Sequence, residues 1–91
     1  MARIKLTPDQ VRQVGTQFKQ ASSQSQELVN RLTQTVNGLQ PDWEGMTKER
    51  FYTDFQQWST SMRQFVELLN SIGQQLDTIA QRFEQADQVS A

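Results

Sequence analysis

The sequence contains no cysteine and no histidine among its 91 residues, and these two absences exclude several kinds of chemistry. Without cysteine the chain has no disulfide and no thiolate metal site. Without histidine it lacks the commonest general base and the commonest metal ligand. We therefore expect no catalytic residues, no metal site and no cofactor, and we interpret the protein as a non-enzyme.

An excess of charge of one sign and long apolar runs are also missing. The 9 Lys and Arg residues nearly balance the 10 Asp and Glu residues, so nothing favours binding to nucleic acid or to an anionic membrane surface. No run approaches the roughly 18 apolar residues that a membrane span needs, so we expect no stable membrane insertion. The basic N-terminus is not followed by the apolar segment of a cleaved signal peptide. If the protein leaves the cell, we expect another export route.

Proline and glycine are scarce, with 2 and 4 residues, and both prolines lie near a predicted helix boundary. Thr7 and Pro8 form a good helix start, because Thr caps the free N–H groups and Pro suits the first helical position. Pro41 and Gly45 fall in the segment QPDWEG, which cannot continue a helix. The sequence therefore predicts a single domain with a helix over about residues 8–39, a turn over about 40–45, a helix over about 46–86 and a frayed tail over 87–91.

Apolar residues recur at alternating steps of three and four along both predicted helices, which is the heptad spacing of helices that pack side by side. In the second helix the spacing holds from Phe51 to Ala86, and in the first it has one weak position at Ser25. This apolar stripe is expected to form the core and the dimer contact. Its central members are Val14, Phe18, Leu28, Leu32, Phe55, Trp58, Met62, Phe65, Leu69, Ile72 and Leu76.

The fold class predicted from these features is an all-α, antiparallel helix–turn–helix hairpin. A lone hairpin of this size buries one seam and is marginal in stability. Val29, Tyr52, Val66 and Leu68 are expected on exposed flanks, where they broaden the stripe. We therefore expect two hairpins to form a four-helix bundle. Because a heptad stripe fits both arrangements, homodimer and heterodimer stay open.

Trp43 is the unusual aromatic residue, because it falls in the predicted turn and off both stripes. Two interpretations stay open: its ring plugs the end of the bundle, or it also takes part in recognition. Trp58 lies on the stripe, so core packing explains it. The carboxylates lie off the stripe and are interpreted as a solvated surface, since nothing indicates the burial that shifts a pKa.

The segment Trp43-Glu44-Gly45 lies in a central turn between two heptad helices, in a chain near a hundred residues. In this it resembles the WXG family of type VII secretion substrates, the ESAT/Esx-like proteins. The resemblance implies export from Gram-positive bacteria by a type VII system with an FtsK/SpoIIIE-type ATPase. It also implies an antiparallel homodimer, or a heterodimer with a related WXG protein. The protein would be cytoplasmic before export and secreted without a cleaved signal peptide.

A second mark of this family is a Tyr-x-x-x-Asp/Glu export motif after the second helix. Here Phe83 and Asp87 keep the spacing of the aromatic residue and the acid, but the hydroxyl is lost. In an antiparallel dimer, Trp43 of one chain lies near Phe83 and Asp87 of the other. The resemblance implies that they form a bipartite export signal there, although Phe83 also continues the apolar stripe.

Three functions remain to be weighed. The first is a secreted type VII substrate or co-substrate exported as a folded dimer. The second is a cytoplasmic adaptor that escorts a larger effector, which the loss of the Tyr hydroxyl at Phe83 keeps open. The third is a membrane-active effector, which the balanced charge and the use of the apolar face for packing disfavour.

Overall fold

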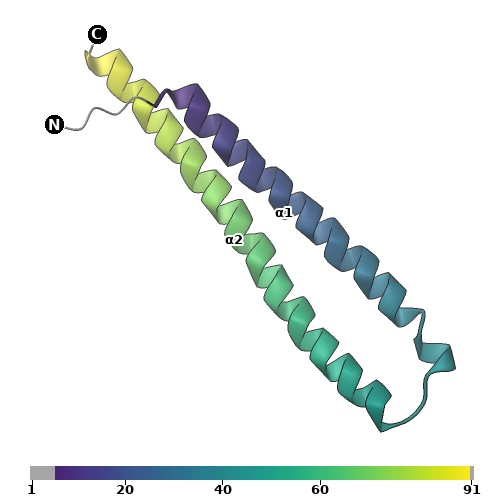
Figure 1. The fold of residues 1–91 in the computed structure, drawn as a ribbon. Coiled ribbons are helices and arrows are strands. Elements are labelled where there is room, and N and C mark those ends of the chain that lie inside the picture. The colour runs from purple at the N-terminus through teal and green to yellow at the C-terminus, as the bar shows by residue number, and fades with distance from the viewer. Residues whose placement is uncertain (1–5, 91) are drawn as a thin grey trace.

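The computed structural model describes residues 6–90, with side chains for residues 6–86. In this range the chain forms α1 (Pro8–Asn37), a short 3-10 helix η1 (Gln40–Asp42) and α2 (Met46–Ser90). The two long helices lie antiparallel, with the turn at one end and both termini at the other (Figure 1). The molecule is a rod with extents of 69 × 21 × 16 Å. The predicted all-α hairpin is therefore confirmed.

The start of α1 has both bonds of a capping box. The Gln10 N–H donates to the Thr7 hydroxyl oxygen at 3.2 Å, and the Thr7 N–H donates to the Gln10 side-chain oxygen at 2.9 Å. α1 ends at Asn37, two residues before the expected end at about 39. The reason is Pro41, which has no N–H to continue the helical bonding and instead belongs to η1.

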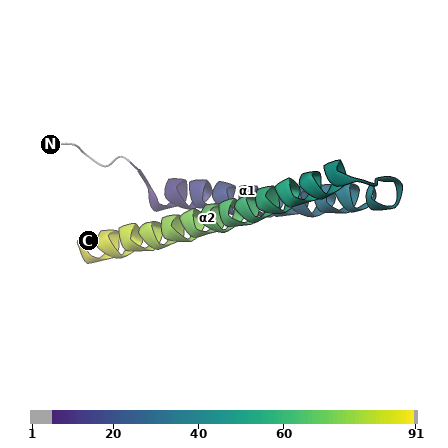
Figure 2. The ribbon, with the colours of Figure 1, turned by 90° about the horizontal axis from the view of Figure 1, so that it is seen from below.

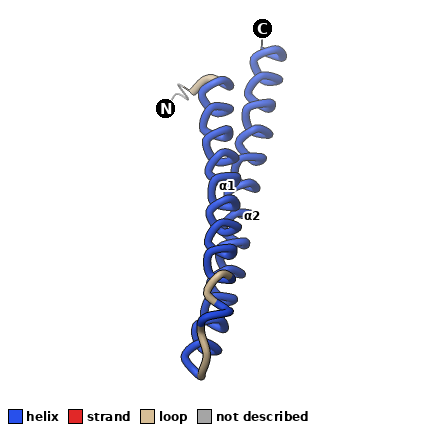
Figure 3. The backbone as a smooth tube through the Cα atoms, turned by 90° about the vertical axis from the view of Figure 1, so that its right-hand side faces the viewer, coloured by secondary structure: helices blue, strands red, loops and turns tan. Residues whose placement is uncertain are grey.

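α2 continues to Ser90, so its backbone is helical through four of the five residues expected to be a frayed tail. Residues 74–91 contain no proline or glycine, and nothing in the sequence stops the helix there. Residue 91 and the side chains of 87–90 lie outside the described residues. The end of α2 extends beyond the start of α1 (Figures 1 and 3). Neither helix, over the residues described, has a segment long and apolar enough to cross a membrane.

The seam between the helices is built largely from small residues spaced seven apart. Gly15, Ser22 and Val29 are buried on α1, and Ser59, Gly73 and Ala80 are buried on α2. The two backbones approach closely at the glycines, because a Cβ atom on Gly73 would lie 2.9 Å from the carbonyl oxygen of Gly15. The helices lie against each other along their length and cross at a shallow angle (Figure 2).

Two hydrogen bonds across the seam fix the register of the helices. The Ser22 hydroxyl donates to the Val66 carbonyl oxygen at 2.8 Å, and the Tyr52 hydroxyl donates to the Val36 carbonyl oxygen at 2.7 Å. Each step of seven residues along α1 matches a step of seven back along α2. The same register places Val29 opposite Ser59.

The expectation that Val29 lies on an exposed flank is wrong, because its side chain is only 1% exposed. The heptad stripe predicted from sequence runs beside the true seam, on one side of it. Val29 repeats the positions of Gly15 and Ser22, which are small enough to let the helices approach. A methyl-bearing side chain at that spacing is therefore enclosed by both helices.

Candidate interaction surfaces

The apolar stripe predicted from sequence forms a surface of the hairpin, which we call the apolar side. Leu69 is buried, whereas Val14, Leu28, Trp58 and Phe65 are exposed, the last by 46%. The remaining central members are intermediate: Phe18, Leu32, Phe55, Met62, Ile72 and Leu76. Exposed apolar residues in such a continuous row along both helices are characteristic of a contact surface rather than of a finished exterior.

Aromatic rings form a continuous ladder from the turn into the apolar side. The centroid of Trp43 lies 5.1 Å from that of Phe51 and 6.2 Å from that of Tyr52. Phe51 lies 6.2 Å from Phe55, which in turn lies 5.3 Å from Trp58. These separations are those of favourable ring pairs. We call these five residues the aromatic ladder; it gives Trp43 a packing role within its own chain.

The turn itself explains the glycine of the Trp-x-Gly segment. Gly45 has φ of +106°, a conformation that residues with a Cβ rarely adopt. Trp43, two residues earlier, is extended. The carbonyl oxygen of Gly45 accepts the Lys48 N–H at 3.2 Å as α2 begins. No atom lies within 4 Å of the place that a Cβ on Gly45 would occupy, so the requirement for glycine is one of backbone conformation.

The C-terminal part of the predicted signal lies at the other end of the rod. Phe83 is partly buried on α2, next to Glu84, which forms an ion pair with Arg12 of α1. The Arg12 hydrogen bond lowers the pKa of Glu84. Asp87 belongs to α2, but its side chain lies outside the described residues. Within one chain the structure does not bring Phe83 near Trp43, because the turn and the free end of α2 are at opposite ends (Figure 1).

The heptad stripe does not predict the seam of small residues. A signal for the seam was present, because Gly15, Ser22 and Val29 recur every seven residues. The residues of the apolar stripe are more hydrophobic than those of the seam, so a search for periodic apolar residues finds the stripe first. The seam forms where two backbones can approach most closely, and this approach requires small residues.

Together these features define a class of protein: a two-helix hairpin with a Trp-x-Gly turn and an apolar side on which Leu28 and Phe65 stay exposed within the described residues. Residues 3–88 match the family described as "WXG100: Proteins of 100 residues with WXG", so this chain belongs to the WXG100 family.

Curated relatives agree over nearly the whole chain. An ESAT-6-like protein of Streptococcus agalactiae is 37% identical over 96% of this chain and 91% of its own length. The type VII secretion system extracellular protein A of Staphylococcus aureus is 34% identical over 97% of this chain and 91% of its own.

Solved structures agree in fold as well as in sequence. The secreted protein EsxB of Bacillus anthracis superposes with a TM-score of 0.85 at 34% identity, covering 96% of this chain and 99% of that one. Geobacillus thermodenitrificans EsxA gives a TM-score of 0.84 at 40% identity over 94% of each chain.

Proposed function

We propose that this protein is a substrate or co-substrate of a type VII secretion system, exported as a folded dimer of hairpins. The observation that carries the proposal is membership of the WXG100 family over residues 3–88, with relatives named as extracellular or secreted proteins of such systems. The protein acts by binding other proteins and has no catalytic activity. It is cytoplasmic before export and needs no cleaved signal peptide.

The apolar side supports the dimer. Residues such as Leu28 and Phe65 are 41% and 46% exposed in the single hairpin. Covering them with a second hairpin removes apolar surface from water, which stabilises by about 25 cal/mol per Å². The second hairpin is another copy of this chain or a related WXG protein, packed antiparallel to make a four-helix bundle.

An antiparallel dimer also unites the two halves of the proposed signal. The rod is 69 Å long, with the turn at one end and the C-terminal end of α2, which contains Phe83, at the other. In the dimer, Trp43 and Gly45 of one hairpin approach Phe83 and Asp87 of its partner. The FtsK/SpoIIIE-type secretion ATPase then recognises a composite surface that a single chain does not present.

Export into the culture medium tests this function. In a Gram-positive host with a type VII system, the protein should accumulate in the medium when the ATPase is intact and stay in the cells when it is inactivated. Equal amounts in the medium of both strains, without cell lysis, would contradict the proposal.

A cytoplasmic adaptor is the second candidate, favoured by Phe83 standing where the export motif has Tyr. An adaptor would stay in the cells of both strains and co-purify with a larger effector. The same experiment therefore separates the two functions.

A further inference from the structure

The side of the hairpin opposite the apolar side carries a row of polar residues that face each other across the helices. We call it the polar side. Its register continues that of the seam, because each pair lies seven residues from the next on both helices. Two of these pairs are ion pairs, Arg12 with Glu84 and Lys19 with Asp77. The same spacing, continued along both helices, matches Gln26 with Asn70 and Thr33 with Arg63.

Arg63 breaks the pattern of charges along this row. Near the termini, Arg12 is paired with Glu84 and Lys19 with Asp77. At the position of Arg63 the opposing residue is Thr33, whose hydroxyl already donates to the Val29 carbonyl oxygen at 2.7 Å. Among the described residues Arg63 has no ion pair.

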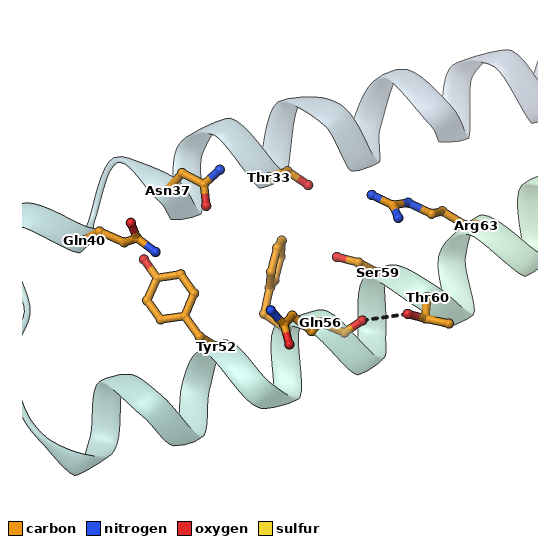
Figure 4. Close-up of a pocket in the computed structure, with 9 residues that line it drawn as sticks. Thr33, Asn37, Gln40, Tyr52, Gln56, Ser59, Thr60 and Arg63 are labelled. Atoms are coloured by element: carbon orange, nitrogen blue, oxygen red, sulfur yellow. Dashed lines mark hydrogen bonds between the residues drawn. The ribbon is translucent and has the colours of Figure 1, made fainter.

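A cavity of about 450 Å³ lies between the helices at this point (Figure 4). That volume falls within the usual range for ligand sites. The guanidinium of Arg63 and the hydroxyl of Ser59 both project into the space between α1 and α2. None of the described residues that line the cavity is acidic.

Ser59 is the second, independent indication of a ligand. It is 8% exposed, and its hydroxyl oxygen is buried without a hydrogen-bond partner. Buried polar groups are almost always paired, because leaving one unpaired costs about 1–3 kcal/mol. The neighbouring hydroxyls of Thr33, Tyr52 and Thr60 all bond to backbone carbonyl oxygens, so Ser59 differs from them.

We propose that this cavity binds the carboxylate of an acidic side chain in an extended segment of a partner protein. The planar fork of the Arg63 guanidinium matches the two oxygens of a carboxylate. One cation and the neutral donor of Ser59 balance one negative charge, whereas a phosphate dianion would remain undercompensated. The side-chain amides of Asn37, Gln40 and Gln56 line the cavity and are both donors and acceptors, which suits a peptide backbone.

This site is separate from the proposed export function. Of the described residues that line the cavity, Phe55 alone belongs to the apolar side, whereas Arg63, Ser59 and the side-chain amides do not. If the cavity binds no carboxylate, the proposals for the dimer and its export are unaffected. If the protein proves not to dimerise, a single hairpin could still bind the acidic segment.

An NMR titration of the isotope-labelled full chain tests the proposal. The probe is a blocked octapeptide of Gly and Ser with one central Glu, and its control carries Gln instead. The Glu peptide should shift the Arg63 Nε–H and the Ser59 amide signals in a saturable way, and the Gln peptide should bind at least tenfold more weakly. Equal binding of the two peptides, or no saturable shift in the millimolar range, would overturn the proposal.

Variants assign the site. Arg63→Gln should weaken the Glu peptide about tenfold or more, since a bond to a charged group is lost, while Arg31→Gln, on an exposed part of α1, should leave it within twofold. Ser59→Ala should weaken binding several-fold and raise the melting temperature, a combination that a purely structural Ser59 would not give. Unchanged binding by Arg63→Gln would refute the site.

Two competitors identify the source of the oxyanion. Glutarate should displace the bound Glu peptide only at a much higher concentration than unlabelled Glu peptide needs for the same displacement. Inorganic phosphate should need a concentration at least as high as glutarate. Glutarate as effective as the peptide would overturn the assignment to a protein segment, and phosphate more effective than either would overturn the assignment to a carboxylate.

Discussion

Replacing Gly73 by Ala tests whether the close approach of the two backbones holds the hairpin together. An added Cβ would lie 2.9 Å from the Gly15 carbonyl oxygen and 2.8 Å from the Cγ atom of Lys19. Lys19 can move, but the backbone oxygen can do so only if the helices separate. Separation weakens the packing along the whole seam, including the Ser22 hydrogen bond to Val66.

The expected size follows from two opposing terms. In a helix interior, Ala is favoured over Gly by about 1 kcal/mol. Overpacking of a tight interior costs about 1–3 kcal/mol. We expect a net loss of up to about 2 kcal/mol in the free energy of unfolding. For a chain of this size each kcal/mol lowers the melting temperature by about 4–8 °C.

The assay is thermal unfolding followed by circular dichroism, with sedimentation to check that variant and wild type have the same assembly state. Ser61→Ala is the matched control, because Ser61 is exposed on the same helix and should gain stability by a few tenths of a kcal/mol at most. If Gly73→Ala melts about 4–8 °C above the wild type, as propensity alone predicts, the argument for a size-limited seam is refuted.

Three further predictions concern the two ends of the rod. Trp43→Ala should lower the free energy of unfolding by about 1–3 kcal/mol, because it removes two ring contacts. It should also reduce export. Normal export with only a lower melting temperature would refute the signal role of Trp43. The hydrogen bond from Arg12 lowers the pKa of Glu84, so the pair stabilises the folded protein at pH values above the ordinary glutamate pKa, and this stabilisation is lost as the pH falls below about 4.3. The difference in melting temperature between the wild type and Glu84→Gln should therefore shrink on acidification. A difference that stays constant would contradict the pairing. Phe83→Tyr should leave secretion equal or better, and reduced secretion would show that the aromatic position is not read as in the family motif.

Much of the fold follows from the sequence because its signals are local. The capping residues Thr7 and Pro8 set the start of α1, and Pro41 with Gly45 confines the turn. These effects act within one turn of helix and do not depend on the rest of the molecule. The heptad spacing then requires two helices that lie side by side.

The identity of the buried seam could not be predicted in the same way. Periodicity selects the residues that are most apolar, such as Leu28 and Phe65, and these turned out to be exposed in the hairpin. The seam depends on the distance between two backbones, which small residues such as Gly15 and Gly73 set. The cavity at Ser59 arises from the register of α1 against α2, so no local sequence pattern predicts it.

Secretion of a Leu28→Asp variant tests the central claim, export as a folded dimer, most directly. Leu28 is 41% exposed and lies outside the seam between α1 and α2, so the substitution should leave the hairpin folded. In the proposed dimer contact, however, an unpaired charge costs several kcal/mol. Trp43 and Phe83 remain intact. The Leu28→Asp variant should be a helical monomer by sedimentation and should be lost from the medium, whereas the control Glu27→Gln should be secreted normally. A Leu28→Asp chain that is monomeric yet secreted at the wild-type level would contradict export as a folded dimer.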